Sequence, residues 1–330
     1  MENVADIEQV RALRTAFEVA GAYGSLDGKV VAITGCSSGL GLQCALAVAR
    51  AGATVVMICR SGKKADSAAA RIREESQSGE IHQIHCDLGK LDSIKQAAQA
   101  FDELKLPLHA LVNNAGCAGI PTWGKLTEGI ESHFAINYLA QFSLAALLHK
   151  HLKSTKGARI VNLASESHRR VRKLDAFEMI VPPRKESYNE LHAYAFSNLC
   201  RILWTRELAK RVEYPVVCLH PAVVASGSSM MQHASIWVLL KQVFTMLWWE
   251  WRPFSNPMQS PQCGARTQTW AAVAPLTEIE RLQLNGKYLN GNNSRNLYSA
   301  SAVSSLAAQT DIDERLFEWT MKHTGLEGTY

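Results

Sequence analysis

The chain has 330 residues, of which 47% are hydrophobic and 20% charged, and its formal net charge is +5 at pH 7. This is an ordinary globular composition, with enough length to bury a sizeable core. Because the basic residues are spread along the chain without a run of five or six like charges, the sequence does not indicate nucleic-acid binding.

The eight cysteines occur singly, without a C-x-x-C pair or a Cys/His cluster at zinc spacing. We therefore expect a reduced, cytoplasmic protein with buried thiols and no metal site. Residues 1–27 form an amphipathic extension that lacks the basic start and apolar core of a signal peptide. No apolar run reaches the roughly 18 residues of a membrane-spanning helix, so a peripheral contact is the only membrane association that we consider.

Short apolar runs rich in β-branched residues recur from residue 29, and longer amphipathic patterns separate them. Each run is apolar throughout rather than at alternate positions, which is typical of buried strands in a parallel sheet. The repeated β-α units predict an α/β fold with a doubly wound parallel sheet of the Rossmann type, in a single domain over residues 28–330. The predicted strands are residues 29–34, 54–59, 81–86, 109–114, 158–164 and 215–220, with a seventh at 286–291.

The first strand runs directly into "TGCSSGLG", which places Gly35, Gly39 and Gly41 before a predicted helix. Without Cβ atoms the backbone can turn tightly and approach a pyrophosphate, whose charge meets free N–H groups at the helix N-terminus. A structural turn could also contain these glycines. Their place between the first strand and the first helix of a repeated β-α pattern favours a dinucleotide site.

The second strand ends in "ICRSGKK", without the carboxylate that binds the ribose hydroxyls of NAD(H). Arg60 can instead bind a 2′-phosphate, so NADP(H) is favoured over NAD(H). The alternative is that Arg60, Lys63 and Lys64 are solvated loop residues. After the third strand, Asp87 is placed to accept a hydrogen bond from the adenine amino group.

The motifs "TGCSSGLG", "CDL", "NNAG", "INYLAQF", "RIVNLASESHR", "YAFSN" and "LHPAVV", in this order, resemble the short-chain dehydrogenase/reductase family. The resemblance extends over residues 26–300. It is greatest to the retinol-dehydrogenase-like group and to the oxidoreductase domains of WW-domain-containing oxidoreductases. It implies an oxidoreductase that binds its cofactor along the carboxyl ends of the strands. The implied cofactor contacts are Gly35, Ser37, Ser38, Gly39, Leu40, Gly41, Arg60, Asp87, Leu88, Asn114, Ala115, Gly116, Pro221, Val224 and Ser226.

The resemblance also implies the catalytic residues. Asn137 matches the structural and proton-relay asparagine, Ser165 matches the serine that polarises the substrate, and Tyr194 matches the catalytic tyrosine. Asn198, four residues after Tyr194, stands where the family has a lysine. Tyr188, followed by His192, is a weaker alternative for the acid.

Asn198 changes the chemistry that the sequence predicts. A lysine ammonium about 4 Å from the phenol contributes on the order of 4 kcal/mol at an effective dielectric of ~20, or roughly three pKa units. Asparagine replaces its hydrogen bonds but not its charge. We therefore expect a slow enzyme biased toward reduction, or else a catalytically weak NADP-binding protein that works through protein partners. Arg201, two helical turns after Tyr194, is expected to be a surface or neighbour contact rather than a replacement for this charge.

The segment 226–260 follows the sixth strand, where the family places a variable substrate segment. Its stretch 234–254 is rich in Trp, Leu, Met and Phe, which suits a small lipophilic substrate such as a retinoid, steroid or fatty aldehyde. Alternatives are a core or lid helix, and peripheral contact with an intracellular membrane. The resemblance also implies a homo-oligomer.

Overall fold

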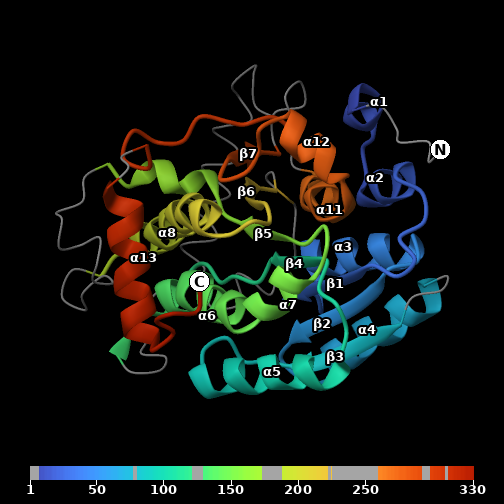
Figure 1. Cartoon of the computed structure of the whole chain (residues 1–330), viewed down its shortest axis with the longest axis horizontal. Helices are drawn as coiled ribbons and strands as arrows, with labels where there is room; N and C mark the ends of the chain where they lie inside the picture. Colours follow the sequence, from blue (N-terminus) through green and yellow to red (C-terminus); the bar gives the residue numbers. More distant parts are fainter. Residues whose placement is uncertain are drawn as a thin grey trace.

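A parallel sheet of seven strands lies at the centre of the computed structural model (Figure 1). The structure describes residues 7–76, 80–120, 129–172, 188–221, 224, 259–291, 298–308 and 311–330. The strands are β1 Val30–Thr34, β2 Thr54–Cys59, β3 Ile81–His85, β4 Ala110–Asn113, β5 Arg159–Leu163, β6 Val216–His220 and β7 Tyr288–Asn290. Their order in the sheet is β3-β2-β1-β4-β5-β6-β7, so the direction of winding reverses between β1 and β4. The predicted doubly wound fold is confirmed.

Alternate residues of the central strands face two separate cores. In β1, Val30 and Ala32 belong to one hydrophobic cluster, while Val31 and Ile33 belong to the other. All residues of β1, β4, β5 and β6 are buried, as their continuous apolar pattern predicts. The expectation of continuous burial was wrong for β3, where Gln83 and His85 are exposed. This strand pairs only with β2 at the edge of the sheet, so part of its surface meets solvent.

Helices cover both faces of the sheet (Figure 1). One face carries α5, α6, α7, α8 and α13, and the other carries α1, α2, α3, α4, α11 and α12. The bounds on the first face are α5 Leu91–Leu104, α6 Ala140–Leu147, α7 His149–Ser154, α8 Glu190–Arg211 and α13 Asp311–Thr324. The bounds on the second face are α1 Ile7–Ala12, α2 Ala16–Ala22, α3 Gly39–Arg50, α4 Lys63–Glu75, α11 Arg266–Val273 and α12 Leu276–Arg281. Three shorter elements are α10 Pro261–Gly264, the π-helical turn η2 Phe134–Leu139 and the 3-10 turn η3 Glu166–Arg170.

The described part of the N-terminal extension packs against the second face. Thr15 and Glu18 form a capping box that begins α2, and Val19 is buried in the core beneath it. The phenol of Tyr23 donates to a Glu278 carboxylate oxygen at 2.7 Å and accepts from the Trp270 indole at 2.8 Å. These contacts join the beginning of the chain to α11 and α12.

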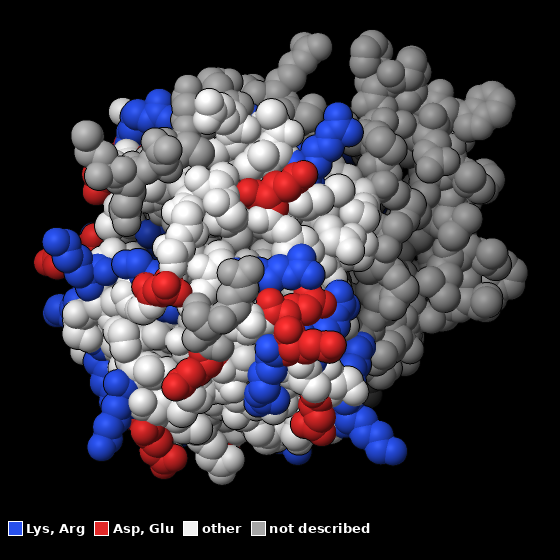
Figure 2. All heavy atoms as spheres, turned by 90° about the vertical axis from the view of Figure 1, so that its right-hand side faces the viewer, with Lys and Arg blue, Asp and Glu red and all other residues white. Residues whose placement is uncertain are grey.

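Charges of both signs are interspersed on the face of the molecule that Figure 2 shows. Among the residues that the structure describes, no helix has both the length and the apolar character needed to cross a bilayer. The stretch 234–254, for which a peripheral membrane contact was considered, lies outside the described residues.

The contact of α13 with η2 generates a matched pair of stability predictions. The Tyr138 phenol is fully buried with its oxygen 2.6 Å from the Thr320 hydroxyl, which itself donates to the Leu316 carbonyl. We expect Thr320→Val to lower the free energy of unfolding by about 1–3 kcal/mol, because the buried phenol loses its acceptor. Tyr138→Phe also removes the group that needs a partner, so its loss should be smaller, about 1 kcal/mol. Urea unfolding measures both changes, and equal losses would contradict this explanation.

Candidate active site

The glycine loop after β1 lies against the backbone that follows β4. An ideal Cβ on Gly35, whose φ is +67°, would lie 2.9 Å from the Cα of Ala115, and one on Gly41 would lie 2.4 Å from the Asn114 amide nitrogen. Gly39 differs, because an added Cβ there meets nothing within 4 Å although its φ is +59°. The close packing therefore leaves no room for a side chain at Gly35 or Gly41, whereas Gly39 borders open space at the start of α3.

This open space fits the pyrophosphate of a dinucleotide. The first turn of α3 contains no acidic residue, and its backbone N–H groups and helix dipole favour an anion. Ser37, Ser38 and Leu40 are partly exposed around the turn. The loop is thus compatible with a phosphate group, and the assignment of these residues to its binding stays a prediction.

Polar contacts fix the glycine loop to the end of β4. The Asn114 amide donates to the Thr34 carbonyl at 2.9 Å, and the Ala115 N–H donates to the Thr34 hydroxyl at the same distance. On the far side, the Gln268 amide donates to the Leu40 carbonyl at 3.1 Å. Sequence reasoning missed Thr34 and Gln268. A buried threonine at a strand end was a usable signal, whereas Gln268 lies in α11, far from every motif.

The predicted adenine end forms a cavity of about 650 Å³ beyond β2 and β3. Asp87 accepts a hydrogen bond from the Gly89 N–H at 3.1 Å through one carboxylate oxygen, and the Lys90 amine lies 4.0 Å from the other. Leu88 is partly buried beside it. The side chains that line the cavity are Arg60, His85, Asp87, Lys90, Leu91, Asp92, Ser93, Lys95 and Gln96. Sequence reasoning named Arg60 and Asp87 but missed the further basic residues.

Asn137 joins the loop after β4 to helix α8. It lies in the π-helical turn η2 and is 1% exposed. Its side-chain oxygen accepts from the Cys117 N–H at 2.7 Å, and its amide donates to the Cys117 carbonyl and the Ser197 hydroxyl, both at 3.0 Å. These contacts use both the oxygen and the amide of the side chain. They connect η2, the loop after β4 and helix α8 through this one residue. Gly116 packs here as well, because a Cβ on it would lie 3.2 Å from the Asn137 side-chain oxygen.

Ser165 and Tyr194 meet at the carboxyl edge of the sheet. Ser165 follows β5 and caps η3, and its hydroxyl accepts from the Ser167 N–H at 3.2 Å. Tyr194 lies in the first turns of α8 and is partly buried. Burial raises the pKa of Tyr194 above its usual value near 10, while the hydrogen bond with Ser165, the charge of Arg201 and the amide of Asn198 lower it. The net direction is upward, so this phenol is neutral at pH 7.

Asn198 is 2% exposed, and its amide donates to the backbone carbonyl of Tyr194 at 2.8 Å. Tyr188, the alternative acid, is engaged elsewhere, because its phenol donates to the Ile120 carbonyl at 2.7 Å and lies near Glu131. The structure therefore brings Ser165 to Tyr194 and not to Tyr188.

Arg201 was expected to be a surface or neighbour contact, and the structure excludes the surface position but agrees with a neighbour contact. Its side chain is 4% exposed and donates to three backbone carbonyls, those of Ala115, Leu163 and Asn137. Helical spacing could not show this. From Ala193 to Leu208 every residue of α8 is buried except Tyr194 and Arg206, so no solvent face marks where a charge should point.

The last predicted cofactor contacts follow β6. Val224 forms a bridge with Gln259 and lies against α10, where a Cβ on Gly264 would come within 2.3 Å of its methyl group. The backbone of Pro221 passes beside Gly291 in the same way, 3.0 Å from where a Cβ would be. Ser226 lies outside the described residues, as does the substrate segment 226–260 except for its last two positions.

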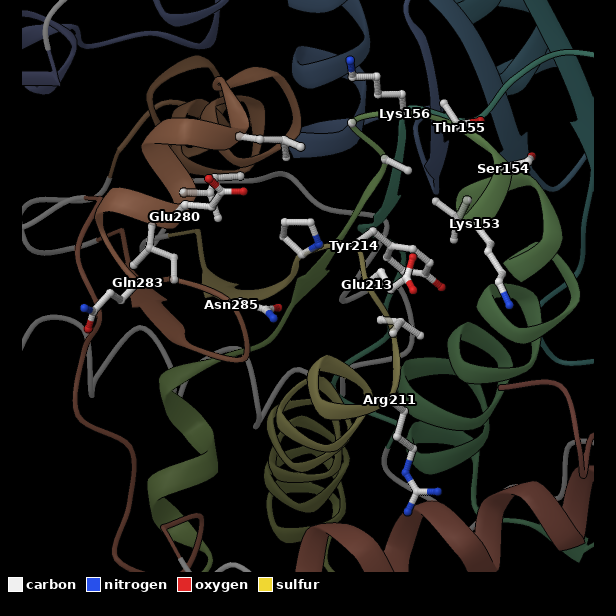
Figure 3. Close-up of a pocket in the computed structure, with 18 residues that line it drawn as sticks. Lys153, Ser154, Thr155, Lys156, Arg211, Glu213, Tyr214, Glu280, Gln283 and Asn285 are labelled. Carbon is white, nitrogen blue, oxygen red and sulfur yellow. The ribbon is translucent and has the colours of Figure 1, made fainter.

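A cavity of about 710 Å³ lies at the opposite edge of the sheet, around the segments that precede β5, β6 and β7 (Figure 3). Lys156, Tyr214 and Asn285 are among its lining residues. None of the predicted site residues lines it. Open α/β sheets bind ligands at the carboxyl ends of their strands, so position rather than volume identifies the candidate site. Within the described part of the chain, no group of three His, Cys, Asp or Glu residues could hold a metal ion.

Comparison with known proteins agrees with this arrangement. The family model described as short chain dehydrogenase matches residues 29–173. WW domain-containing oxidoreductase of Danio rerio is 37% identical over 305 residues, which cover 89% of this chain and 69% of that protein. Retinol dehydrogenase 12 of Mus musculus is 34% identical over 305 residues, which cover 92% and 88%.

Solved structures show the same fold. A putative uncharacterized protein from Mycobacterium paratuberculosis has a TM-score of 0.67 and 24% identity, over 93% of this chain and 97% of that one. L-sorbose reductase from Gluconobacter frateurii, complexed with NADPH and L-sorbose, has a TM-score of 0.62 and 18% identity, over 81% and 95%. Taken with the sequence relatives, these findings show that the chain belongs to the short-chain dehydrogenase/reductase family, whose fold binds NAD(P)(H).

Proposed function

We propose that the protein is an NADP(H)-dependent oxidoreductase that acts on a lipophilic carbonyl or alcohol and works mainly as a reductase. The observation that carries this proposal is the proximity of Ser165 to Tyr194 at the carboxyl edge of the sheet, where burial raises the pKa of the phenol, Ser165 lowers it in part, and the phenol is neutral at pH 7. A neutral phenol can donate a proton but cannot accept one.

In this proposal each residue has a defined task. Bound NADPH supplies the hydride for the carbonyl carbon. Ser165 donates a hydrogen bond to the carbonyl oxygen, where negative charge develops, and Tyr194 transfers its proton to the same oxygen. Asn137 holds the loop at Cys117 in place through its three hydrogen bonds. Alcohol oxidation would need Tyr194 as a phenolate, which its raised pKa makes scarce near neutral pH.

The preference for NADP(H) is supported by the charges at the adenine end. Arg60, Lys90 and Lys95 line one cavity there together with Asp87 and Asp92, so its basic side chains outnumber the acidic ones. In addition, β2 ends without a carboxylate. A 2′-phosphate carries negative charge that these cations attract, and an arginine can bind it through two donors.

The substrate class is proposed from the apolar character of residues 226–260. A retinoid, steroid or fatty aldehyde suits that composition, and one similar protein is named retinol dehydrogenase 12. Peripheral contact of residues 234–254 with an intracellular membrane and formation of a homo-oligomer are part of the same proposal.

The second candidate is a catalytically weak NADP-binding protein that works through protein partners. It is favoured by Asn198, which holds no charge where the family has a lysine. Binding of NADPH without turnover of any aldehyde, ketone or alcohol in a broad panel would support this second function over the first.

The first prediction of this proposal concerns Tyr194. We expect Tyr194→Phe to lower kcat for carbonyl reduction by about 100-fold or more, because the proton donor is lost. Fluorescence titration should give an unchanged Kd for NADPH. Tyr188→Phe is the matched control and should retain reduction, since that phenol donates to the Ile120 carbonyl. Equal rates for Tyr194→Phe and wild type would remove Tyr194 from the mechanism.

A second prediction concerns cofactor choice. We expect Arg60→Ala to weaken NADPH binding about tenfold while NADH binding changes little, because only NADPH carries the 2′-phosphate. Lys63→Ala serves as control, since Lys63 begins α4 and does not line the adenine cavity. A parallel loss for both cofactors would contradict the assignment of Arg60 to the 2′-phosphate.

A third prediction concerns direction. Asn198→Lys adds an ammonium beside Tyr194 and should lower its pKa, so we expect alcohol oxidation at pH 7–8 to rise more than carbonyl reduction. In the wild type, reduction should persist up to the raised pKa of Tyr194 and fall only as pH rises through it. Initial rates in both directions against pH measure this effect. If neither rate changes in Asn198→Lys, the charge argument is wrong.

A further inference from the structure

Arg201 combines features that a purely architectural residue does not need. Its guanidinium is buried below the active site and donates to carbonyls from three separate elements. These carbonyls belong to Ala115 after β4, Asn137 in η2 and Leu163 at the end of β5, two residues before Ser165. The backbone of Gly116 lies against it, because a Cβ there would be 3.8 Å from one guanidinium nitrogen and 3.9 Å from another.

Among the described residues, the partners of the Arg201 guanidinium are neutral carbonyls, and no carboxylate influences its pKa. Burying a cation without a counter-charge is strongly unfavourable. Neutral donors could bridge three carbonyls without that cost. Burial lowers the pKa of Arg201 to about 10, so the side chain is nevertheless charged at pH 7. A nearby group that becomes negative during the reaction would explain why a charged guanidinium is buried here without a carboxylate.

That group is the phenol of Tyr194, seven residues earlier on the same helix. The guanidinium is close to the site of this phenol, because it binds the Leu163 carbonyl, two residues before Ser165, and lies against Gly116. Its charge lowers the pKa of Tyr194, as does Ser165. The Cys117 thiol is also near but is neutral, because burial raises its pKa to about 12. The side chains that face the phenol are Ser165, Asn198, Arg201, Cys117 and the ring of His133, whose centroid is 6.0 Å from that of Tyr194.

We infer that Arg201 is a positioning residue that supplies, from the next turns of α8, the positive charge that Asn198 does not supply four residues after Tyr194. The inference deepens the proposed function and rests on it. When the O–H bond of Tyr194 breaks, its proton goes to the oxygen of the reduced carbonyl and the electron pair stays on the phenolate. The fixed guanidinium stabilises that negative charge until a proton from solvent restores the phenol.

This arrangement also distinguishes Arg201 from a lysine at position 198. Three carbonyls hold the guanidinium in place, so it acts on the phenolate through its field and keeps its position whether or not cofactor is bound. The hydrogen-bonding task at position 198 is left to the amide of Asn198, which is in contact with Tyr194.

The test measures the titration of residue 194 without substrate or cofactor. A fluorotyrosine incorporated at Tyr194 brings the phenol titration into a pH range where the chain stays folded, and fluorine NMR reports its pKa. We expect Arg201→Gln to raise this pKa by about one unit or more. Arg201→Lys should keep the phenol pKa close to that of wild type, because it keeps a positive charge. In the double variant Asn198→Lys/Arg201→Gln, the new ammonium at position 198 should bring the phenol pKa back toward that of wild type. Arg206→Gln is the matched control, because Arg206 is on the same helix but binds Asp313 and the Ala307 carbonyl.

Folding is checked by circular dichroism, and Arg201→Gln is also made in the Asn198→Lys background as a second measurement. A rise of the pKa in either background supports the inference. Titrations that coincide with and without Arg201 overturn it. If neither glutamine chain folds, Arg201 is required by the architecture and the inference is overturned.

A functional measurement separates this inference from the proposed function. In carbonyl reduction, the fall of kcat with rising pH should move upward with the phenol pKa in Arg201→Gln, and kcat near pH 7 should drop while the Kd for NADPH stays the same. A shifted titration in a chain that reduces no carbonyl would contradict the proposed function and leave the electrostatic role of Arg201 in place. An unshifted phenol titration in a chain that still reduces carbonyls would contradict the electrostatic role of Arg201 and leave the proposed function in place.

Discussion

The close approach of two backbone segments, the turn after β1 and the turn after β4, is the constraint on which the site depends. The sheet order reverses between these strands, so their carboxyl ends open onto one crevice. Gly35 permits the contact with Ala115, and the Thr34 hydroxyl holds the Ala115 N–H. The backbone carbonyl of Ala115 accepts a hydrogen bond from the Arg201 guanidinium. One residue thereby connects the cofactor loop to the helix that carries Tyr194.

Helix α8 determines what chemistry this crevice can do. Tyr194, Asn198 and Arg201 lie on it at spacings of four and three residues, so a change at one position alters the surroundings of the others. Burial raises the pKa of the phenol, and the neighbouring donors and charge oppose that rise only in part. Under the proposed function, this balance favours proton donation, and hence reduction, over proton removal.

Most of the fold was predictable because it depends on local patterns. Continuous apolar runs identified six strands, the short β7 was also predicted, and the glycine spacing identified the turn before α3. The edge strand β3 departed from its pattern because only one neighbour covers it. Within the site, motif order pointed to Ser165, Tyr194 and Asn137, whose catalytic roles stay a prediction. It was insufficient for Arg201, because a helix buried on all sides has no amphipathic pattern, and for Gln268, because its contact with Leu40 spans most of the chain.

The three carbonyls around Arg201 have a consequence for the dynamics of the reaction. In a polar solvent, dipoles must turn toward a charge as it forms, and that reorientation makes up part of the activation barrier. Here the guanidinium is oriented by Ala115, Asn137 and Leu163, all of which the fold fixes before any ligand arrives. Under the inferred role, little reorganisation would accompany proton transfer, and rigidity of the sheet edge, rather than motion of a flexible cation, would set the electrostatic field in the crevice.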